Sequence, residues 1–453
     1  EFLNAIADEI EALGDELINT YCSESGLPPG RAMGERGRTM FQLRSFAELV
    51  KKGDWVDAHI DTAQPDRAPL AKPDIRKMMV PLGPVVVFGA SNFPLAYSTA
   101  GGDTAAALAA GCPVIVKSHP MHAGTGELVA SAIIKAAEKT GMPNGVFSNL
   151  NSSGIEVGQE LVAHSKVKAV GFTGSIKGGR ALLDIAAKRE EPIPVFAEMG
   201  SINPVVILPK ALDNRNEEIA KTYAGSITLG AGQFCTNPGI IVICDSSNES
   251  SLVEEIKNKM ATMELPPMVH SNIEARYKKQ ITHLSSSNSG VQVHLFNEND
   301  SALGVVSGAD FIESPLLSEE VFGPFSLVVQ CHSIDEMVNV AQVLKGQLTA
   351  TILSTTEDQH NLKILLTKVQ AKVGRILFEG VPTGVAVNQA MQHGGPFPAS
   401  TDERFTAVGV KAMDRWLRPV SYQNWPDKLL PKALQNNNPL GLHRLINGTL
   451  IKD

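Results

Sequence analysis

Cysteine is scarce in this sequence of 453 residues, and its placement argues against two kinds of covalent support. No C-x-x-C pair is present, and an odd number of widely spaced cysteines does not suit a disulfide framework or a zinc site. We therefore expect no metal, and one thiol is free for chemistry. The cysteines are Cys22, Cys112, Cys235, Cys244 and Cys331.

Long apolar runs and a surplus of basic residues are also missing. No apolar run is long enough to cross a bilayer, so we expect no membrane association. Acidic side chains outnumber basic ones by 48 to 40, which argues against a nucleic-acid partner. The first residues, EFLNAIADEIEALGDELI, predict an acidic amphipathic helix rather than a signal peptide, and we expect a cytoplasmic protein.

The sequence does contain a regular alternation of short apolar strands and helices. This alternation runs from residue 85 to residue 172 and resumes after Ser201. Such a rhythm predicts parallel sheets covered by helices on both faces. The boundary between the two series is expected near residues 197–201.

Two further segments complete the expected organisation. Residues 1–50 are predicted to be helical, with a turn at 26–30 and a second helix over 38–51. The stretch 61–77 is polar and contains three prolines, which predicts an extended arm rather than a core element.

Three residues near the ends of predicted strands and turns suit carbonyl chemistry. Cys235 lies in GAGQFCTNP, where a nearby helix terminus would lower the pKa of an exposed thiol. Glu198 ends an apolar strand and suits a general base, and Asn92 follows the first strand, where its amide could donate to an oxyanion. Each residue alone also suits a structural role, as a buried thiol, a strand-end charge or a turn amide.

A second group of residues suits the phosphates of a dinucleotide. Lys117 and Ser118 end a strand, GFTGS occupies 171–175, and Gly154 and Gly158 form a spaced pair. Together they offer a cation, hydroxyl groups and close backbone approach. No G-x-G-x-x-G follows a strand, so the common Rossmann fingerprint is absent. Singly, each glycine cluster also predicts a plain turn.

The order of six motifs resembles the aldehyde dehydrogenase superfamily. These are strand-Asn, strand-Lys, GFTGS, Glu-x-Gly, GQ-x-C and EEVFGP, and the resemblance runs from about residue 38 to about residue 424. It implies an α/β fold with a Rossmann-type dinucleotide-binding domain, an α/β catalytic domain, a small β oligomerisation arm, and assembly as a homodimer or homotetramer. The expected parts are a dinucleotide-binding domain at 1–60 and 81–199, the arm at 61–80 and 414–424, a catalytic domain at 200–413 and a tail at 425–453.

The resemblance also implies a reaction, the NAD(P)-dependent oxidation of an aldehyde to a carboxylate through a thiohemiacetal and a thioester. Cys235 would be the nucleophile, and Asn92 with the backbone N–H of Cys235 would form the oxyanion hole. Glu198 would activate the water that hydrolyses the thioester. A different class stays open at this point, a cofactor-free cysteine hydrolase that uses Cys235 and His393.

For the cofactor, the resemblance implies that Lys117 holds the adenosine ribose, Ser175 the pyrophosphate and Glu320 the nicotinamide ribose, with Phe322 near the nicotinamide. Pro120 stands where NAD-preferring relatives often carry a glutamate, so NADP is expected, with NAD as the alternative. The remaining expected cofactor contacts are Phe88, Gly89, Ser118, His119, Gly154, Gly158 and Gly174.

The C-terminal run NQAMQHGGPFPAS, with KSHP, GQFCTNPG and RPVSYQNWP, resembles the α-ketoglutarate semialdehyde (2,5-dioxovalerate) dehydrogenase branch. The NADP-linked fatty aldehyde dehydrogenases of luminous bacteria have a similar His-Gly-Gly-Pro run. His393 in this run could approach Cys235 and tune it, or make a structural hydrogen bond.

The branch resemblance implies a substrate whose far end is an α-keto carboxylate. Arg38, on the helix expected to line the substrate tunnel, would hold that carboxylate, and Phe93 would supply an apolar wall. A solvated Arg38, another cation such as Arg404, and a long-chain aliphatic aldehyde as the substrate are the alternatives.

Overall fold

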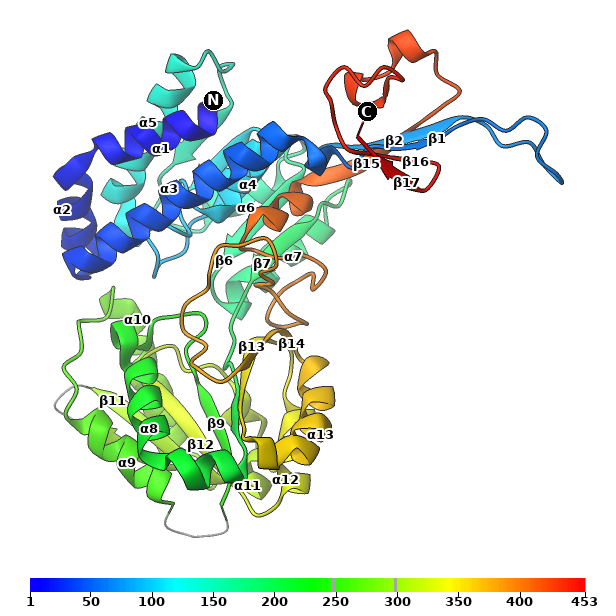
Figure 1. The fold of residues 1–453 in the computed structure, drawn as a ribbon. Coiled ribbons are helices and arrows are strands. Elements are labelled where there is room, and N and C mark those ends of the chain that lie inside the picture. Colours follow the sequence, from blue (N-terminus) through cyan, green and yellow to red (C-terminus); the bar gives the residue numbers. More distant parts are fainter. Residues whose placement is uncertain (246–249, 297–299, 453) are drawn as a thin grey trace.

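The computed structural model describes residues 1–245, 250–296 and 300–452. Two α/β bodies lie one above the other in Figure 1, and a β ribbon projects from the upper body. Within the described ranges, no helix combines the length and the hydropathy that a bilayer span requires.

The upper body is built on one parallel sheet. Its strands are β3 (Val85–Phe88), β4 (Val114–Lys117), β5 (Phe147–Leu150), β6 (Ala169–Thr173) and β7 (Val195–Glu198), and the helices between them are α4 (Gly102–Ala110), α5 (Ala123–Lys139), α6 (Glu156–Ala163) and α7 (Ile176–Ala187). The strand order is β5-β4-β3-β6-β7. The order reverses between β3 and β6, and ligands bind beyond the carboxyl ends of the strands at such a point.

Three N-terminal helices pack on this body. They are α1 (Phe2–Ala12), α2 (Gly14–Ser25) and α3 (Pro29–Lys52), and α1 packs against both α3 and α5. The helix α3 begins at Pro29 rather than at the predicted residue 38. Gly26, with a φ of 69°, ends α2, and a proline at the first helical position starts α3 early. Gly30, Gly34 and Gly37 remain helical despite a cost of about 1 kcal/mol each.

The lower body contains a larger sheet with the order β10-β11-β12-β9-β8-β13-β14, parallel except for the edge strand β10. Its strands are β8 (Val205–Ile207), β9 (Ile240–Cys244), β10 (Gln292–Phe296), β11 (Ser301–Ser307), β12 (Phe325–Cys331), β13 (Gln347–Leu353) and β14 (Val373–Phe378). Its helices are α8 (Pro209–Thr228), α9 (Ser251–Ala261), α10 (Ser271–Ser285), α11 (Gly308–Glu313), α12 (Ile334–Val343) and α13 (Gln359–Gln370). Strand β13, next to the edge strand β14, is buried along its whole length, as expected between two helical layers.

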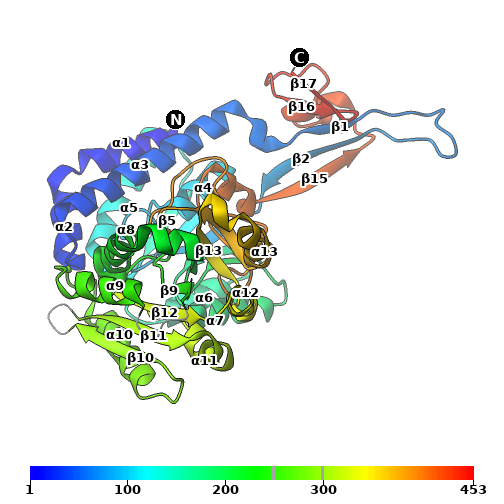
Figure 2. The ribbon, with the colours of Figure 1, turned by 60° about the horizontal axis from the view of Figure 1, so that its bottom comes forward.

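The ribbon is a third sheet with the order β15-β2-β1-β16-β17. Its strands are β1 (His59–Asp61), β2 (Ile75–Pro81), β15 (Leu417–Gln423), β16 (Arg444–Ile446) and β17 (Thr449–Ile451). The predicted extended arm therefore pairs with the C-terminal segment, and residues 444–451 join the same sheet. The view in Figure 2 shows this ribbon projecting well beyond the two bodies.

Two connections bring the bodies together around one point. Residues 199–204 lead from β7 in the upper sheet to β8 in the lower sheet, and the long segment 379–416 returns from β14 to the ribbon. Glu198, at the end of β7, forms an antiparallel bridge with Ser400 in this returning segment. The carboxyl end of the upper sheet is thereby closed by loops from both bodies.

Candidate active site

Cys235 lies in the loop that connects α8 to β9. Gly230 and Gly232 have positive φ angles of 58° and 67°, so the chain turns sharply just before the cysteine. A Cβ at Gly232 would lie 2.1 Å from the carbonyl oxygen of Gly323, which leaves room for glycine alone. The Asn203 amide donates to the carbonyl oxygen of Cys235 at 2.9 Å and holds the loop in place.

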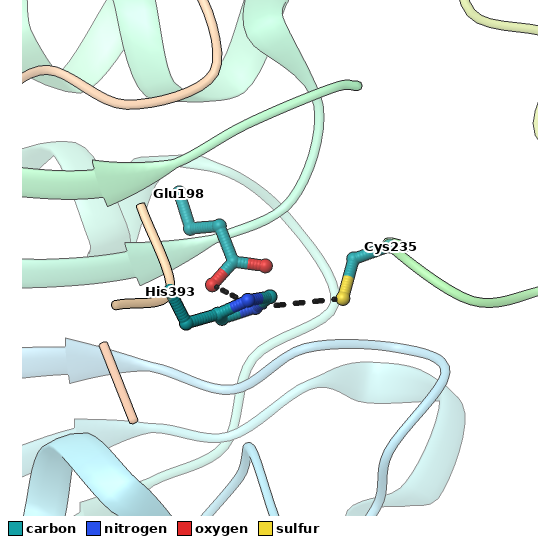
Figure 3. Close-up of side chains that lie close together, drawn as sticks. All are labelled: Glu198, Cys235 and His393. Carbon is teal, nitrogen blue, oxygen red and sulfur yellow. Dashed lines mark hydrogen bonds and ion pairs between the residues drawn. The ribbon is translucent and has the colours of Figure 1, made fainter. Parts of the chain in front are cut away.

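Two side chains from distant parts of the chain, His393 and Glu198, lie close to this cysteine (Figure 3). The Nε2 atom of His393 lies 3.6 Å from Sγ of Cys235 and 3.0 Å from Oε2 of Glu198. The side chains of His393 and Glu198 are 1% and 4% exposed, whereas Cys235 is partly exposed. The structure thus places His393 next to the thiol, one of the two arrangements that the sequence left open.

The backbone around His393 fixes the ring in this position. Its N–H donates to Oγ1 of Thr406 at 2.9 Å, and its carbonyl accepts from the N–H of Ala407 at 2.7 Å. The Thr406 hydroxyl in turn donates to the carbonyl of Val408. Because one imidazole nitrogen faces both the sulfur and the carboxylate, it can share a proton with only one of them at a time.

The electrostatic surroundings of the thiol differ from the sequence-based expectation. Burial raises the pKa of Cys235 well above its ordinary value, and the negative charges of Glu198 and Glu320 raise it further. The expectation that a helix terminus lowers this pKa is therefore wrong. The preceding helix α8 ends at Thr228, so it offers its C-terminal end, which repels negative charge.

Asn92 lies close to the cysteine, in a loop after β3. Its side-chain N–H donates to the carbonyl of Gln233 at 3.0 Å, two residues before Cys235. Asn92 also lines a cavity together with Cys235. When the sulfur attacks an aldehyde, the negative charge develops on the aldehyde oxygen, which would compete with the Gln233 carbonyl for this donor. The oxyanion role of Asn92 stays a prediction.

One cavity, of about 330 Å³, opens at the ends of β6 and β7, and we call it the β7 cavity. Four of the predicted cofactor contacts line it alongside Cys235 and Glu198. They are Gly174, Ser175, Glu320 and Phe322. The sequence reasoning missed Asn272, Ile273 and Arg276 of α10, which line it from the opposite side. No recognised motif covers that stretch.

The polar groups of the β7 cavity suit a nucleotide. The Ser175 hydroxyl accepts from the N–H of Gly178 and begins α7, so the N-terminal end of this helix faces the cavity. Glu320 accepts from the N–H of Ser201 at 3.3 Å, and burial raises its pKa to about 7. A carboxylate with spare acceptor capacity can bind ribose hydroxyls, as predicted for Glu320.

The other predicted cofactor contacts lie outside the lining of this cavity. Lys117, at the end of β4, donates to the carbonyl of Ser152 at 3.0 Å and has no acidic partner among the described residues. Ser118 donates to Oδ1 of Asn149, and burial lowers the pKa of His119 to about 3, so its ring is neutral. The remaining contacts are packed closely against other side chains, namely Phe88 on Phe172 and Gly158, Gly89 on Ser98, and Gly154 on Glu156.

A second cavity, of about 310 Å³, reaches Cys235 from the side of α3, and we call it the α3 cavity. Arg38 lines it, as predicted, and donates to the carbonyl of Val385 and to the hydroxyl of Tyr97. Phe93 forms part of the wall. The alternative cation Arg404 is 77% exposed at the surface and pairs with Asp402.

Arg31 is the main residue of the α3 cavity that sequence reasoning missed. Its guanidinium lies 4.5 Å from the ring centre of Phe93 and 4.6 Å from that of Phe234. Its Nε is 3.6 Å from Glu35, whose carboxylate is already bound by two backbone N–H groups. The spacing of seven residues between Arg31 and Arg38 places both on one face of α3, a signal that the sequence did offer.

The fold and the lining of the β7 cavity are those expected of a nicotinamide-dependent oxidoreductase. The chain belongs to the aldehyde dehydrogenase family, whose profile matches residues 1–396. It is therefore an enzyme that oxidises an aldehyde to a carboxylate with NAD(P). Family membership favours this activity over the cofactor-free hydrolase, although Cys235 and His393 do lie side by side.

Two curated relatives match nearly the whole chain. An enzyme of Azospirillum brasilense named alpha-ketoglutaric semialdehyde dehydrogenase 2 is 50% identical over 99% of this chain and 86% of its own length. The alpha-ketoglutaric semialdehyde dehydrogenase of Acinetobacter baylyi is 45% identical over 100% of this chain and 87% of its own length.

Solved structures share the fold at lower identity. A glyceraldehyde-3-phosphate dehydrogenase from Methanocaldococcus jannaschii, complexed with NADP, superimposes with a TM-score of 0.76 at 21% identity, over 93% of this chain and 88% of that one. A variant of 1-pyrroline-5-carboxylate dehydrogenase from Thermus thermophilus gives a TM-score of 0.76 at 20% identity, over 93% and 80% of the two chains.

Proposed function

We propose that this enzyme oxidises α-ketoglutarate semialdehyde to α-ketoglutarate, with NADP as the preferred cofactor. The observation that carries the proposal is the pair of guanidinium groups, Arg31 and Arg38, in the same cavity as Cys235. An aliphatic aldehyde would gain nothing from them, whereas an α-keto carboxylate offers them oxygen acceptors. The names of the two curated relatives support the same substrate.

The α3 cavity provides separate surfaces for the two ends of such a substrate. The rings of Phe93, Tyr97 and Phe234 stand edge to face in a row, with centres 5.2 and 5.4 Å apart. Phe93 is the middle ring of the row; Arg31 lies over Phe93 and Phe234, and Arg38 lies over Tyr97. The apolar row accommodates the methylene groups, while the guanidinium groups bind the keto carboxylate.

The chemistry begins with ionisation of Cys235. His393 accepts the thiol proton at Nε2, and the resulting imidazolium pairs with Glu198 at 3.0 Å. The thiolate then attacks the aldehyde carbon, and the side-chain N–H of Asn92 and the backbone N–H of Cys235 stabilise the oxyanion. Lys117, Ser175 and Glu320 would hold NAD(P), which would supply the hydride acceptor for that carbon. Loss of the hydride would leave a thioester on Cys235.

Glu198 completes the reaction by removing a proton from water as the water attacks the thioester. The thiol is regenerated, and the carboxylate leaves with the oxygen of water. In balance, the aldehyde, NAD(P)⁺ and water give the carboxylate, NAD(P)H and two protons. Oε2 of Glu198 faces His393, whereas Oε1 has no hydrogen-bond partner among the described residues and is available to water.

The preference for NADP follows from the residues around Lys117. No described acidic side chain pairs with this lysine, and Pro120 stands where a carboxylate would repel a 2′-phosphate. Ser118 and the neutral His119 add hydrogen-bonding groups beside it. The homodimeric or homotetrameric state and the cytoplasmic location remain predictions from the sequence.

The experiment that tests the substrate compares α-ketoglutarate semialdehyde with pentanal, a neutral aldehyde of equal chain length, by the absorbance of the reduced nicotinamide. Arg31→Met and Arg38→Met should each lose about 2–4 kcal/mol in transition-state binding for the keto acid, a fall in kcat/KM of about 30- to 1000-fold. Turnover of pentanal should change little.

Arg44→Met is the matched control, because Arg44 is a cation of the same helix that pairs with Asp8 and Glu11 outside the cavity. It should leave both substrates unaffected. Equal losses on both aldehydes in the Arg31 and Arg38 variants would remove these residues from substrate binding. A wild-type preference for a long apolar aldehyde would contradict the proposed substrate itself.

A further inference from the structure

The meeting point of Cys235, His393 and Glu198 has the geometry of a metal site. Their ligand atoms, Sγ, Nε2 and a carboxylate oxygen, all lie within 4.8 Å of one another. They come from three separate segments, the loop after α8, the returning segment 379–416 and the end of β7, and Figure 3 shows the side chains converging from two sides. Sulfur, imidazole nitrogen and carboxylate oxygen are the ligands that zinc prefers.

Two of the three distances between the ligand atoms lie close to those of a tetrahedral ion. Zinc bonds of about 2.3 Å to sulfur and about 2.0 Å to nitrogen or oxygen place sulfur and nitrogen about 3.5 Å apart, and nitrogen and oxygen about 3.3 Å apart. The observed separations are 3.6 Å between Cys235 and His393 and 3.0 Å between His393 and Glu198. The third pair, Sγ of Cys235 and the ligand oxygen of Glu198, lies within 4.8 Å. A tetrahedral ion would need these two atoms about 3.5 Å apart, so the site closes by a movement of up to about 1.3 Å between them.

The charge of the site also calls for a cation. Glu198 is 4% exposed, and neither of its oxygens accepts a hydrogen bond from the described residues, although His393 is near. Glu320 adds a second carboxylate to the same cavity. Two carboxylates in one largely enclosed site are costly, and a dication beside Glu198 would offset the negative charge of both groups.

A metal ion can also reach this point and keep an open position there. Cys235 lines both the β7 cavity and the α3 cavity, so the sulfur is accessible from two sides. Three protein ligands and one open position facing a cavity match the coordination of zinc sites that are not purely structural.

From this geometry we propose that Cys235, His393 and Glu198 form a reversible Zn²⁺-binding site that switches the enzyme off. Binding exchanges the thiol proton for the metal, so that Cys–SH and Zn²⁺ give Cys–S⁻–Zn²⁺ and a proton. No oxidant or reductant is consumed, and a chelator reverses the reaction. The metal occupies the nucleophile and the base together, so it excludes the aldehyde. Metal binding stands on geometry alone, whereas the inhibition rests on the proposed function.

The test uses metal-free enzyme and two probes, Zn²⁺ by calorimetry and Co²⁺ by the near-ultraviolet absorption that thiolate ligation produces. We expect one equivalent of either metal, one proton released on Zn²⁺ binding, and an affinity at least about 100-fold weaker in Cys235→Ser and His393→Gln. Cys244→Ala, which changes a half-buried thiol of β9, should bind like the wild type.

Activity measurements separate this proposal from the proposed function. With a chelator present, wild-type turnover of the aldehyde tests the function alone. Added Zn²⁺ should then inhibit turnover, and excess chelator should restore it. Metal binding that is unchanged in both site variants, or a Co²⁺ complex without thiolate absorption, would overturn the zinc site even if the dehydrogenase activity is as proposed.

Discussion

Replacing His393 by glutamine tests how the enzyme ionises a thiol that its surroundings hold protonated. Burial and the charges of Glu198 and Glu320 raise the pKa of Cys235, so a lone thiolate forms only at alkaline pH. If His393 takes the proton, the products are a thiolate and an imidazolium that pairs with Glu198. Glutamine keeps a polar side chain in the same place but cannot accept that proton.

The expected magnitude follows from the contact that is lost. A hydrogen bond to a charged group is worth about 1.5–3 kcal/mol, which corresponds to about 1–2 pKa units. The pH profile of Cys235 alkylation by iodoacetamide, measured without cofactor, should therefore move up by about 1–2 units in His393→Gln. The sign is upward because the variant must form its thiolate without a neighbouring cation.

Controls make this result specific to the site. Cys235→Ala reports alkylation of the other cysteines, which is subtracted. His360→Gln changes an exposed histidine on α13 and should leave the profile in place. An unchanged or more acidic midpoint in His393→Gln would refute proton transfer to His393 and leave the ring a structural hydrogen-bonding role.

Three other predictions concern the established reaction. Cys235→Ala should abolish turnover while binding of NADPH, followed by its nicotinamide fluorescence, stays within a few-fold; turnover at the normal rate would exclude the thioester. Glu198→Gln should give one burst of reduced cofactor per site and then stall, because it lacks the base for hydrolysis; no burst would mean that Glu198 acts before hydride transfer. The kcat/KM for NADP should at least equal that for NAD; a hundredfold preference for NAD, about 2.7 kcal/mol, would contradict the role given to Pro120.

The meeting of Cys235 and Glu198 at one site could be predicted from sequence because local chain chemistry constrains both residues, and their roles as nucleophile and base stay predictions. Cys235 follows glycines that are typical of a tight turn, and Gly232 has no room for a side chain. Glu198 follows three apolar residues and ends a strand of a parallel sheet. Ligands bind beyond the carboxyl ends of such strands. In both cases the neighbours within a few residues carry the information.

Arg31 and the ribbon show what such local reasoning cannot reach. The place of Arg31 depends on Phe93 and Phe234, which lie 62 and 203 positions further along the chain. The pairing of β1 with β16 joins residues His59 and Leu445, and three-residue strands have no periodicity to detect. The pKa of Cys235 was likewise misjudged, because it is set by burial and by carboxylates that only the fold brings near.

The two cavities impose an order on the reaction. The α3 cavity holds the groups proposed to bind the substrate. Among the residues that the structure describes, Cys235 alone lines both cavities. Glu198 lines the β7 cavity and not the α3 cavity. It shares the β7 cavity with Glu320 and Phe322, the residues proposed to hold the nicotinamide end of the cofactor. Water that Glu198 activates must therefore occupy space next to the cofactor site, on the side of the thioester away from the acyl chain. If Glu198 and the cofactor share the β7 cavity as proposed, we expect the reduced cofactor to move or leave before water attacks the thioester.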